Sequence, residues 1–321
     1  MFNHRTVHLE ISSKCTLKCP RCPRTELHPD TVNQEISLAE FQSGFPPDVI
    51  SKIESFILCG DIGDAIYATE FLEIIKYIKQ TSAGRIRIVT NGSYKKVNWW
   101  QELGSMLTDT DQVTFSVDGW DNESNNQYRV NSDFDSIVLG IKTLRASSKC
   151  LIQWSTIYFA FNQDRINDIR ELATSLGCDR FQTVKSSKFD GRYVTNTVDL
   201  LKPADELVAN TLVYEPTVEP LSPSKYVPIS PAWSPHPHAW AKCLNYKKDL
   251  FVGVDGLVSP CPWFNSGYQD NWFIKQNRSR LSIKNRSFFE ILNDVELWDQ
   301  LTQSFDNDPL EICQLKCKND R

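Results

Sequence analysis

Residues 6–23 read TVHLEISSKCTLKCPRCP, an alternating apolar run that leads into three closely spaced cysteines. Thr6–Ile11 alternates as a β-strand does, so the strand delivers the chain directly into the cysteine loop. Cys15, Cys19 and Cys22 follow the spacing C-x3-C-x2-C. Three thiolates so close together can hold three irons of a 4Fe–4S cluster and leave the fourth iron without a protein ligand. An open iron of this kind is a place where a substrate or cofactor binds.

A zinc site is the alternative interpretation of the same three cysteines. It requires a fourth ligand from elsewhere in the chain, such as His28. The triad by itself leaves both interpretations open.

Length and composition describe a globular protein with a sizeable core. The chain has 321 residues, of which 40% are hydrophobic, and this leaves room for one large domain and a small one. No stretch is long and apolar enough to span a membrane, and the first residues lack the apolar run of a signal peptide. We therefore expect a cytoplasmic protein with no membrane partner, in which clustered cysteines bind metals. The net charge of −5 argues against nucleic acid as a partner.

The first 185 residues alternate short strand-like runs with longer amphipathic ones. Beyond Thr6–Ile11, the predicted strands are Ser55–Cys59, Arg85–Thr90, Gln112–Val117, Leu151–Ile157 and Arg180–Val184. Helical spacing of apolar residues predicts helices over Tyr67–Gln80, Phe134–Ala146 and Arg165–Leu176. Repeated βα units predict a parallel sheet, and periodicity does not decide whether that sheet is open or curled into a partial barrel.

The remainder of the chain changes character twice. Residues 186–240 hold half of the sixteen prolines, which is typical of a connector with little regular structure. Leu250–Val254 and Leu257–Pro260 then flank the turn-forming pair Asp255-Gly256, a strong signal for a β-hairpin. A single helix is predicted over Arg286–Phe305.

A second set of cysteines surrounds this hairpin. Cys243 precedes it and Cys261 follows it, and a hairpin brings its two ends together. Cys313 and Cys317 come after the predicted helix and supply two further thiolates. Four thiolates close an iron–sulfur cluster completely. A structural zinc site is the alternative, although the spacing differs from the usual pair of C-x2-C knuckles.

Taken together, the two cysteine sets resemble those of the radical S-adenosylmethionine enzymes that carry a twitch domain, the short relative of the SPASM domain. The resemblance covers roughly residues 5–185 and 240–320. It implies a partial (β/α)6 TIM-like barrel core over residues 1–185, a proline-rich connector over 186–240 and a small α+β twitch domain over 241–321. The twitch domain, a β-hairpin plus a helix, would hold an auxiliary 4Fe–4S cluster on Cys243, Cys261, Cys313 and Cys317.

The resemblance also implies a reaction. The cofactors would be two 4Fe–4S clusters and S-adenosylmethionine, whose reductive cleavage yields a 5′-deoxyadenosyl radical that takes a hydrogen atom from the substrate. With four cysteine ligands, the auxiliary cluster is expected to accept an electron from the product radical, which makes the net reaction a dehydrogenation. The expected partners are a small-molecule or peptide substrate and a one-electron donor such as flavodoxin or ferredoxin. The alternative from another class is a non-catalytic module in which both cysteine sets hold zinc.

Several loops after the strands are candidates for contacts with S-adenosylmethionine. Gly60, Asp61, Gly63 and Asp64 follow the second strand, where the family places a Gly-Gly-Glu-like loop against the amino group of the cofactor's methionine. Glycines allow the backbone to approach a ligand closely. The alternative is an ordinary βα turn in which Asp64 caps the next helix.

Other contacts are expected in the same layer. Ser116 and Asp118 follow the fourth strand, where family members often place a polar residue against the ribose hydroxyls; a turn formed by Asp118 and the following glycine is the alternative. Asn91 ends the third strand and is expected to line the same cleft. Arg21 stands immediately before Cys22, where family members often carry an aromatic or apolar residue near the adenine, and its flat guanidinium can stack on a purine.

Cys59 is the remaining candidate. It ends the second strand directly before the glycine loop, where a thiol could donate a hydrogen atom to a substrate radical, as epimerases of this superfamily require. The alternative functions are therefore a radical peptide-modifying enzyme or an epimerase that uses Cys59. Cys150 and Cys178 are expected to be inert core residues.

Overall fold

The structure is a computed structural model that describes residues 6–26, 31–185, 189, 201–204, 243, 250–265, 271–314 and 317. His28 and most of the predicted proline-rich connector lie outside the described residues. None of the described helices is both long and apolar enough to cross a membrane.

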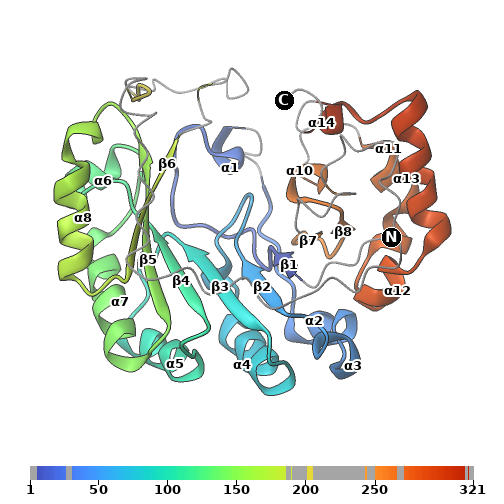
Figure 1. The fold of residues 1–321 in the computed structure, drawn as a ribbon, viewed down its shortest axis with the longest axis horizontal. Helices are drawn as coiled ribbons and strands as arrows, with labels where there is room; N and C mark the ends of the chain where they lie inside the picture. Colours follow the sequence, from blue (N-terminus) through green and yellow to red (C-terminus); the bar gives the residue numbers. More distant parts are fainter. Residues whose placement is uncertain are drawn as a thin grey trace.

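One curved sheet runs through the described part of the chain (Figure 1). Its strands are β1 (Thr6–Leu9), β2 (Ser55–Leu58), β3 (Arg85–Thr90), β4 (Gln112–Ser116), β5 (Leu151–Tyr158), β6 (Arg180–Lys185), β7 (Leu250–Val252) and β8 (Val258–Ser259). They lie in the order β6-β5-β4-β3-β2-β1-β7-β8, and β8 is the antiparallel one. The predicted α/β class with a partial barrel of parallel strands is therefore confirmed.

Helices follow most of the parallel strands. In the first part of the chain they are α1 (Pro23–Glu26), α2 (Leu38–Gly44), α3 (Pro47–Ile50), η1 (Ala65–Tyr67), α4 (Phe71–Thr81), α5 (Val97–Met106), α6 (Asn122–Asn126), α7 (Phe134–Ser147), η2 (Gln163–Arg165) and α8 (Ile166–Ser175). After β8 come α10 (Pro262–Asn265), α11 (Trp272–Leu281), α12 (Phe288–Leu292), α13 (Val295–Asn307) and α14 (Glu311–Cys313). Helices α4, α5, α7 and α8 line the outer face of the sheet, and α10–α14 lie beyond its β1 side (Figure 1).

The two faces of the sheet follow from strand alternation. In β3, Ile86 and Ile88 are fully buried, whereas Arg87 between them is exposed on the opposite, inner face. Helix α4 presents Phe71, Ile74, Ile75 and Ile78 to the same core. Complete burial of an Ile or Phe side chain contributes about 1.5–3 kcal/mol, so this layer of the core holds α4 on the sheet.

Two predicted helices differ from the structure. The helix predicted over Tyr67–Gln80 starts later, at Phe71, because Asp64 caps the short 3-10 turn η1 and Ala68 then takes an extended ψ of 137°. The single helix predicted over Arg286–Phe305 is wrong, since the chain forms α12 and α13 with a break at Asn293 and Asp294. The Asp294 carboxylate accepts the Leu297 N–H and starts a new helix there.

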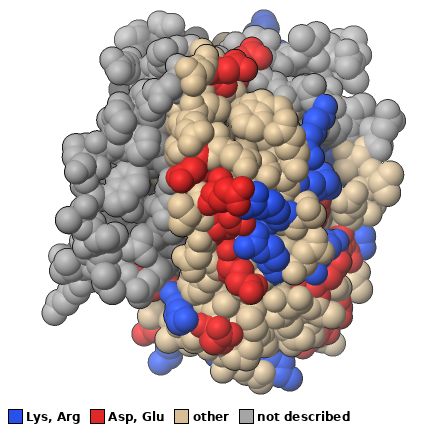
Figure 2. Space-filling model, turned by 90° about the vertical axis from the view of Figure 1, so that its right-hand side faces the viewer, with Lys and Arg blue, Asp and Glu red and all other residues tan. Residues whose placement is uncertain are grey.

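The predicted hairpin is present, with Gly256 at a φ of +80° in its turn. Its first strand, β7, continues the main sheet because it pairs in parallel with β1, Val7 opposite Leu250. The helices that follow carry interleaved acidic and basic side chains on their outer face (Figure 2). The domain boundaries expected from the sequence stay a prediction.

Candidate cofactor site beside the first strand

The three cysteines of the triad lie in the loop that leaves the end of β1. Cys19 is 7% exposed, and Cys15 and Cys22 are half-buried. Burial, with the charges of Asp64 and Cys22 added to it, raises the pKa of the Cys15 thiol to about 12. Burial also raises the pKa of Cys19, to which Cys22 and Cys15 add. The three thiols are therefore close enough to act on one another.

An apolar shell surrounds the triad. Its buried members are Leu17, Cys19, Tyr128 and Phe159, with Cys15, Cys22, Ile157, Phe161, Phe189 and Leu201 packed against them. Three thiols in one loop, one buried and two half-buried within this cluster, are a donor set that fits an iron–sulfur cluster, which stabilises thiolates and is protected by apolar surroundings. Among the described residues, no three His, Cys, Asp or Glu side chains converge on a position for a single metal ion. In a four-iron cluster each thiolate binds a different iron.

The segment Tyr128–Ser132 holds the cysteine loop in place. The Lys18 N–H donates to the Val130 carbonyl at 2.9 Å, and the Asn131 side-chain amide donates to the Thr16 carbonyl at 2.6 Å. Asn131 adopts a left-handed φ of 69°, a conformation that Asn tolerates better than most residues. These bonds position the loop before any cofactor binds.

The loop from Gly60 to Asp64 packs directly on the cysteine loop. A side chain at Gly63 would collide with the Ser12 carbonyl oxygen, so the close approach of the two backbones requires glycine there. The Asp64 N–H donates to the Lys14 carbonyl at 2.9 Å. The structure thus gives this glycine a packing reason, and the contact of Gly60, Asp61 and Gly63 with S-adenosylmethionine stays a prediction.

Asp64 organises the strand ends around it. Its carboxylate accepts the backbone and side-chain N–H groups of Asn91, both at 2.7 Å, and the Thr90 hydroxyl at 2.9 Å. It also caps η1 by accepting the Ile66 N–H, as the turn interpretation predicts. Burial raises the pKa of Asp64 to about 6, and the donated hydrogen bonds counteract this.

Asn91 and Ser116 lie where the sequence places them. The Asn91 side-chain amide is 3.8 Å from the Cys15 sulfur, so the end of β3 does reach the triad. Ser116 is half-buried at the end of β4, in register with Ser155 of β5. Their contacts with the cofactor stay predictions.

Asp118 has protein partners on both carboxylate oxygens. One accepts the Ile157 N–H at 2.6 Å and the other accepts Nε of Arg129 at 2.6 Å. The residue is fully buried. The expected ribose contact would have to compete with these bonds, so Ser116 is the better candidate of the two.

Arg21 adopts a left-handed φ of 56°, and its guanidinium carbon lies 4.5 Å from the centre of the Phe189 ring. The stacking expected toward a purine is here made with Phe189.

Cys59 is half-buried at the end of β2, and burial raises the pKa of its thiol to about 12, with the charge of Asp64 acting in the same direction. The thiol therefore keeps its hydrogen at neutral pH, as a hydrogen-atom donor must. Its role as that donor stays a prediction.

Three members of the second cysteine set lie close to one another. Burial raises the pKa of Cys313, and the charges of Cys261 and Cys317 raise it further. The short helices α10 and α14, which begin next to Cys261 and end at Cys313, are in contact. Cys243 is buried in the core against which Cys261 and Cys313 also pack. In the sequence, the hairpin brings only Cys243 and Cys261 together, and the grouping with Cys313 and Cys317 follows from the family resemblance.

Two polar side chains that hold the loops of this site together were not expected from the sequence. Glu10 is 4% exposed and accepts the N–H groups of Ile62 and Gly63 at 2.7 and 3.1 Å. Tyr67 donates to the Ser93 carbonyl at 2.7 Å and receives the Thr16 hydroxyl at 3.1 Å, which ties β3 to the cysteine loop. The place of Glu10 in the predicted strand Thr6–Ile11, where polar and apolar residues alternate, gave no signal that its carboxylate would be buried.

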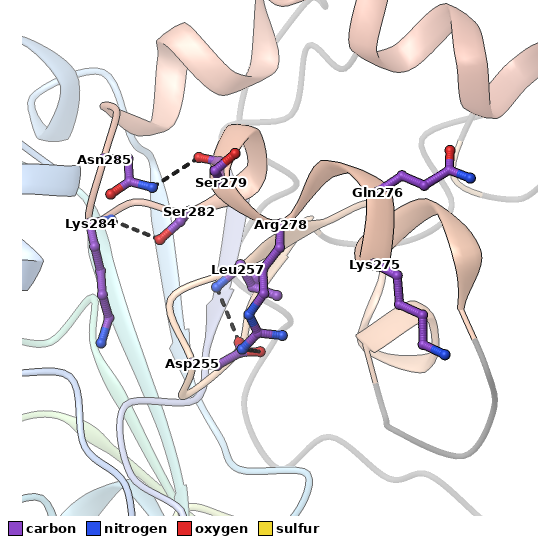
Figure 3. A pocket seen from close by; sticks show the side chains of 9 residues that line it. All are labelled: Asp255, Leu257, Lys275, Gln276, Arg278, Ser279, Ser282, Lys284 and Asn285. Atoms are coloured by element: carbon purple, nitrogen blue, oxygen red, sulfur yellow. Dashed lines mark hydrogen bonds and ion pairs between the residues drawn. The ribbon is translucent and has the colours of Figure 1, made fainter.

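A hollow of about 580 Å³ lies away from these residues, between the hairpin turn and α11 (Figure 3). Arg278 reaches across it to Asp255 at 3.3 Å, and Lys284 pairs with Glu40 at 2.8 Å. None of the residues predicted to bind a cofactor or metal lines it.

Comparison with solved structures shows that the fold is shared with SuiB and anSMEcpe, both of which have been solved with bound S-adenosylmethionine. The chain is similar to Streptococcus suis SuiB bound to S-adenosylmethionine, with a TM-score of 0.59 and 12% identity over 92% of this chain and 67% of SuiB. It is similar at a TM-score of 0.61 to SuiB bound to precursor peptide SuiA, with 12% identity over 92% of this chain and 66% of SuiB. It is also similar to anSMEcpe with bound AdoMet and Cp18Cys peptide, with a TM-score of 0.54 and 16% identity over 98% of this chain and 86% of that one. No protein-family model matches the sequence, and no curated protein does.

Proposed function

We propose that this chain is a radical S-adenosylmethionine enzyme that abstracts hydrogen from a polar substrate. One observation carries the proposal: the three thiols of Cys15, Cys19 and Cys22 lie in one loop after β1 and pack in one apolar cluster. The shared fold supports it, because solved structures with that fold hold S-adenosylmethionine. The zinc alternative requires a fourth ligand such as His28, which lies outside the described residues.

The residues would divide the work as follows. Cys15, Cys19 and Cys22 hold the cluster, while Asn91 and Ser116 lie where the cofactor would bind. When bound, the cluster and S-adenosylmethionine supply a 5′-deoxyadenosyl radical, which takes a hydrogen atom from the substrate. The shell around Tyr128 and Phe159 keeps water away from the site.

Cys243, Cys261, Cys313 and Cys317 would hold a second 4Fe–4S cluster that accepts an electron from the product, so that the net reaction is an oxidation. Strand pairing supports this arrangement. Strand β7 of the hairpin pairs with β1, Leu250 opposite Val7, and Cys261 follows the second strand of that hairpin. The hairpin that leads to Cys261 is therefore built onto the strand that leads into the triad.

The inner face of the sheet supports a polar substrate. The Gln112 amide donates to Gln153 at 3.2 Å, and the Gln153 amide donates to Gln182 at 2.6 Å, which forms a row of amides across β4, β5 and β6. Arg87 lies on the same face. Amide groups suit the backbone of a peptide, and the similar structures SuiB and anSMEcpe hold peptides. A small polyol would use the same groups, and a cytoplasmic flavodoxin or ferredoxin would supply the electron.

The test is anaerobic reconstitution with iron and sulfide, followed by dithionite and S-adenosylmethionine. We expect brown protein with about eight irons per chain and release of 5′-deoxyadenosine. Cys19→Ala should abolish that release, whereas Cys150→Ala, which removes a core thiol, should not. Cys313→Ala should lower the iron content and retain the release. A colourless protein that binds zinc at both sites would contradict the proposal. Deuterated peptides and polyols, followed by mass analysis of the 5′-deoxyadenosine, would then identify the substrate class.

A further inference from the structure

An ion pair between Asp118 and Arg129 is buried beside the cysteine triad. The Arg129 Nε donates to the Asp118 carboxylate at 2.6 Å, and the two side chains are 15% and 0% exposed. Removing two charges from water costs several kcal/mol per ion, so a buried pair is seldom kept for stability alone. A functional role is therefore expected for this pair.

The pair is held from both sides. The second carboxylate oxygen of Asp118 accepts the Ile157 N–H at 2.6 Å, and its backbone carbonyl accepts the Asn162 side-chain amide at 2.8 Å. The Arg129 N–H donates to the Asn125 carbonyl at 2.8 Å, and its guanidinium lies 5.1 Å from the centre of the Tyr128 ring. The position of the guanidinium is thus determined by the surrounding structure.

Arg129 lies next to the cysteine loop. Its neighbour Tyr128 packs in one buried cluster with Cys19, and its other neighbour, Val130, accepts the Lys18 N–H at 2.9 Å. Arg129 and Cys19 both lie inside the molecule, where charges interact more strongly than in water.

We propose that Arg129 is a positioning residue that raises the reduction potential of the cluster held by Cys15, Cys19 and Cys22, and that Asp118 holds its guanidinium beside Cys19. The inference rests on the proposed function, since it requires an iron–sulfur cluster on the triad. A cluster that accepts one electron gains one negative charge, and a fixed cation nearby stabilises that state. Net charge and burial around a cluster are known controls of its potential.

The test is a redox titration of the reconstituted full-length chain, followed by electron paramagnetic resonance. The signal that changes on adding S-adenosylmethionine belongs to the N-terminal cluster. Arg129→Gln should lower the midpoint potential of that cluster. Asp118→Asn removes the neighbouring negative charge and should raise the midpoint potential of that cluster. Arg129→Lys, which keeps the charge, should have a midpoint potential near that of the unaltered protein. Arg165→Gln is the control, because Arg165 pairs with Asp168 at 50% and 55% exposure.

Opposite shifts for Arg129→Gln and Asp118→Asn support the electrostatic role, because a merely structural pair would change both variants in the same direction. Equal shifts for Arg129→Gln and Arg129→Lys would overturn it even if both variants lose some iron. If the unaltered chain binds no iron at the triad, the proposed function itself fails. If the cluster forms and its potential is the same in all four variants, only this inference fails.

Discussion

Glu10 illustrates what a single side chain does in this protein. It follows β1, and its carboxyl is buried where it accepts two N–H groups from the loop that packs on the cysteines. Burial raises its pKa from 4.5 to about 7, and nearby Asp61 adds to this, while the donated hydrogen bonds counteract it. The carboxyl therefore joins the two loops of the site, and its contribution to the free energy of folding depends on pH.

We expect Glu10→Gln to flatten the pH dependence of stability. Because the folded chain binds the proton more tightly, the contribution of Glu10 is fully present below pH 4.5 and is lost as the pH rises to about 7. The loss is at most on the order of 3 kcal/mol, from about 1.4 kcal/mol per pKa unit. Glutamine keeps an acceptor oxygen and cannot titrate. Urea unfolding at pH 5 and pH 8 would measure the difference. The control is Glu73→Gln on the exposed face of α4, and an equal pH dependence in both variants would exclude this role.

At the scale of elements, the break between α12 and α13 organises the C-terminal region. Asp294 accepts the Leu297 N–H in the first turn of α13 and also pairs with Arg280 and Arg286, each at 2.7 Å. These two arginines come from the end of α11 and from the residues before α12. A single carboxylate thus joins three segments, which is why a continuous helix does not form.

Asp294→Ala should lower the free energy of unfolding by about 2 kcal/mol, because it removes a helix cap and leaves two half-buried guanidinium groups without their partner. Glu296→Ala is the matched control. Glu296 is 81% exposed and lies 3.5 Å from Arg280, so its loss should change stability by less than about 0.5 kcal/mol. Chemical denaturation of both variants would measure the values. Similar losses of unfolding free energy in the two variants would show that the helix cap and the ion pairs of Asp294 do not stabilise the fold.

At the scale of the whole molecule, the C-terminal region completes the sheet that the N-terminal region begins. Strand β7 pairs with β1, and the Glu10 N–H donates to the Val252 carbonyl at 2.9 Å. Leu250 and Val252 are fully buried in the same core as Val7 and Leu9. The first strand, which leads into the cysteine loop, is therefore an interior strand only while β7 is present.

We expect residues 1–185 expressed alone to aggregate. Without β7, the backbone of β1 is an open strand edge next to exposed apolar side chains, and such edges pair with other chains. Size-exclusion chromatography of the fragment and of the full chain would measure this. A monomeric fragment that unfolds cooperatively would show instead that the barrel core is independent of the C-terminal region.

Much of the architecture was predictable because its signals are local. All six predicted parallel strands form; Arg85–Thr90 shows the period of two that burial of one face leaves, and Ser55–Leu58 is a short apolar run buried throughout. The hairpin at Gly256 was predictable from turn chemistry. The hydrogen bond of Glu10 with Gly63 and the ion pair of Asp118 with Arg129 were not predictable, because the partners are distant in sequence or on another element.

The sequence by itself therefore determined the βα rhythm, the turns and the two sets of cysteines, because each depends on neighbours along the chain. Only the tertiary structure decided that β7 lies beside β1, that α12 and α13 are separate, and that Asp118 binds Arg129 rather than remaining open to a ligand. Those outcomes depend on which surfaces meet once the sheet has formed. The physical reason is that a buried polar group must find a partner, and only the folded chain determines which one lies within reach.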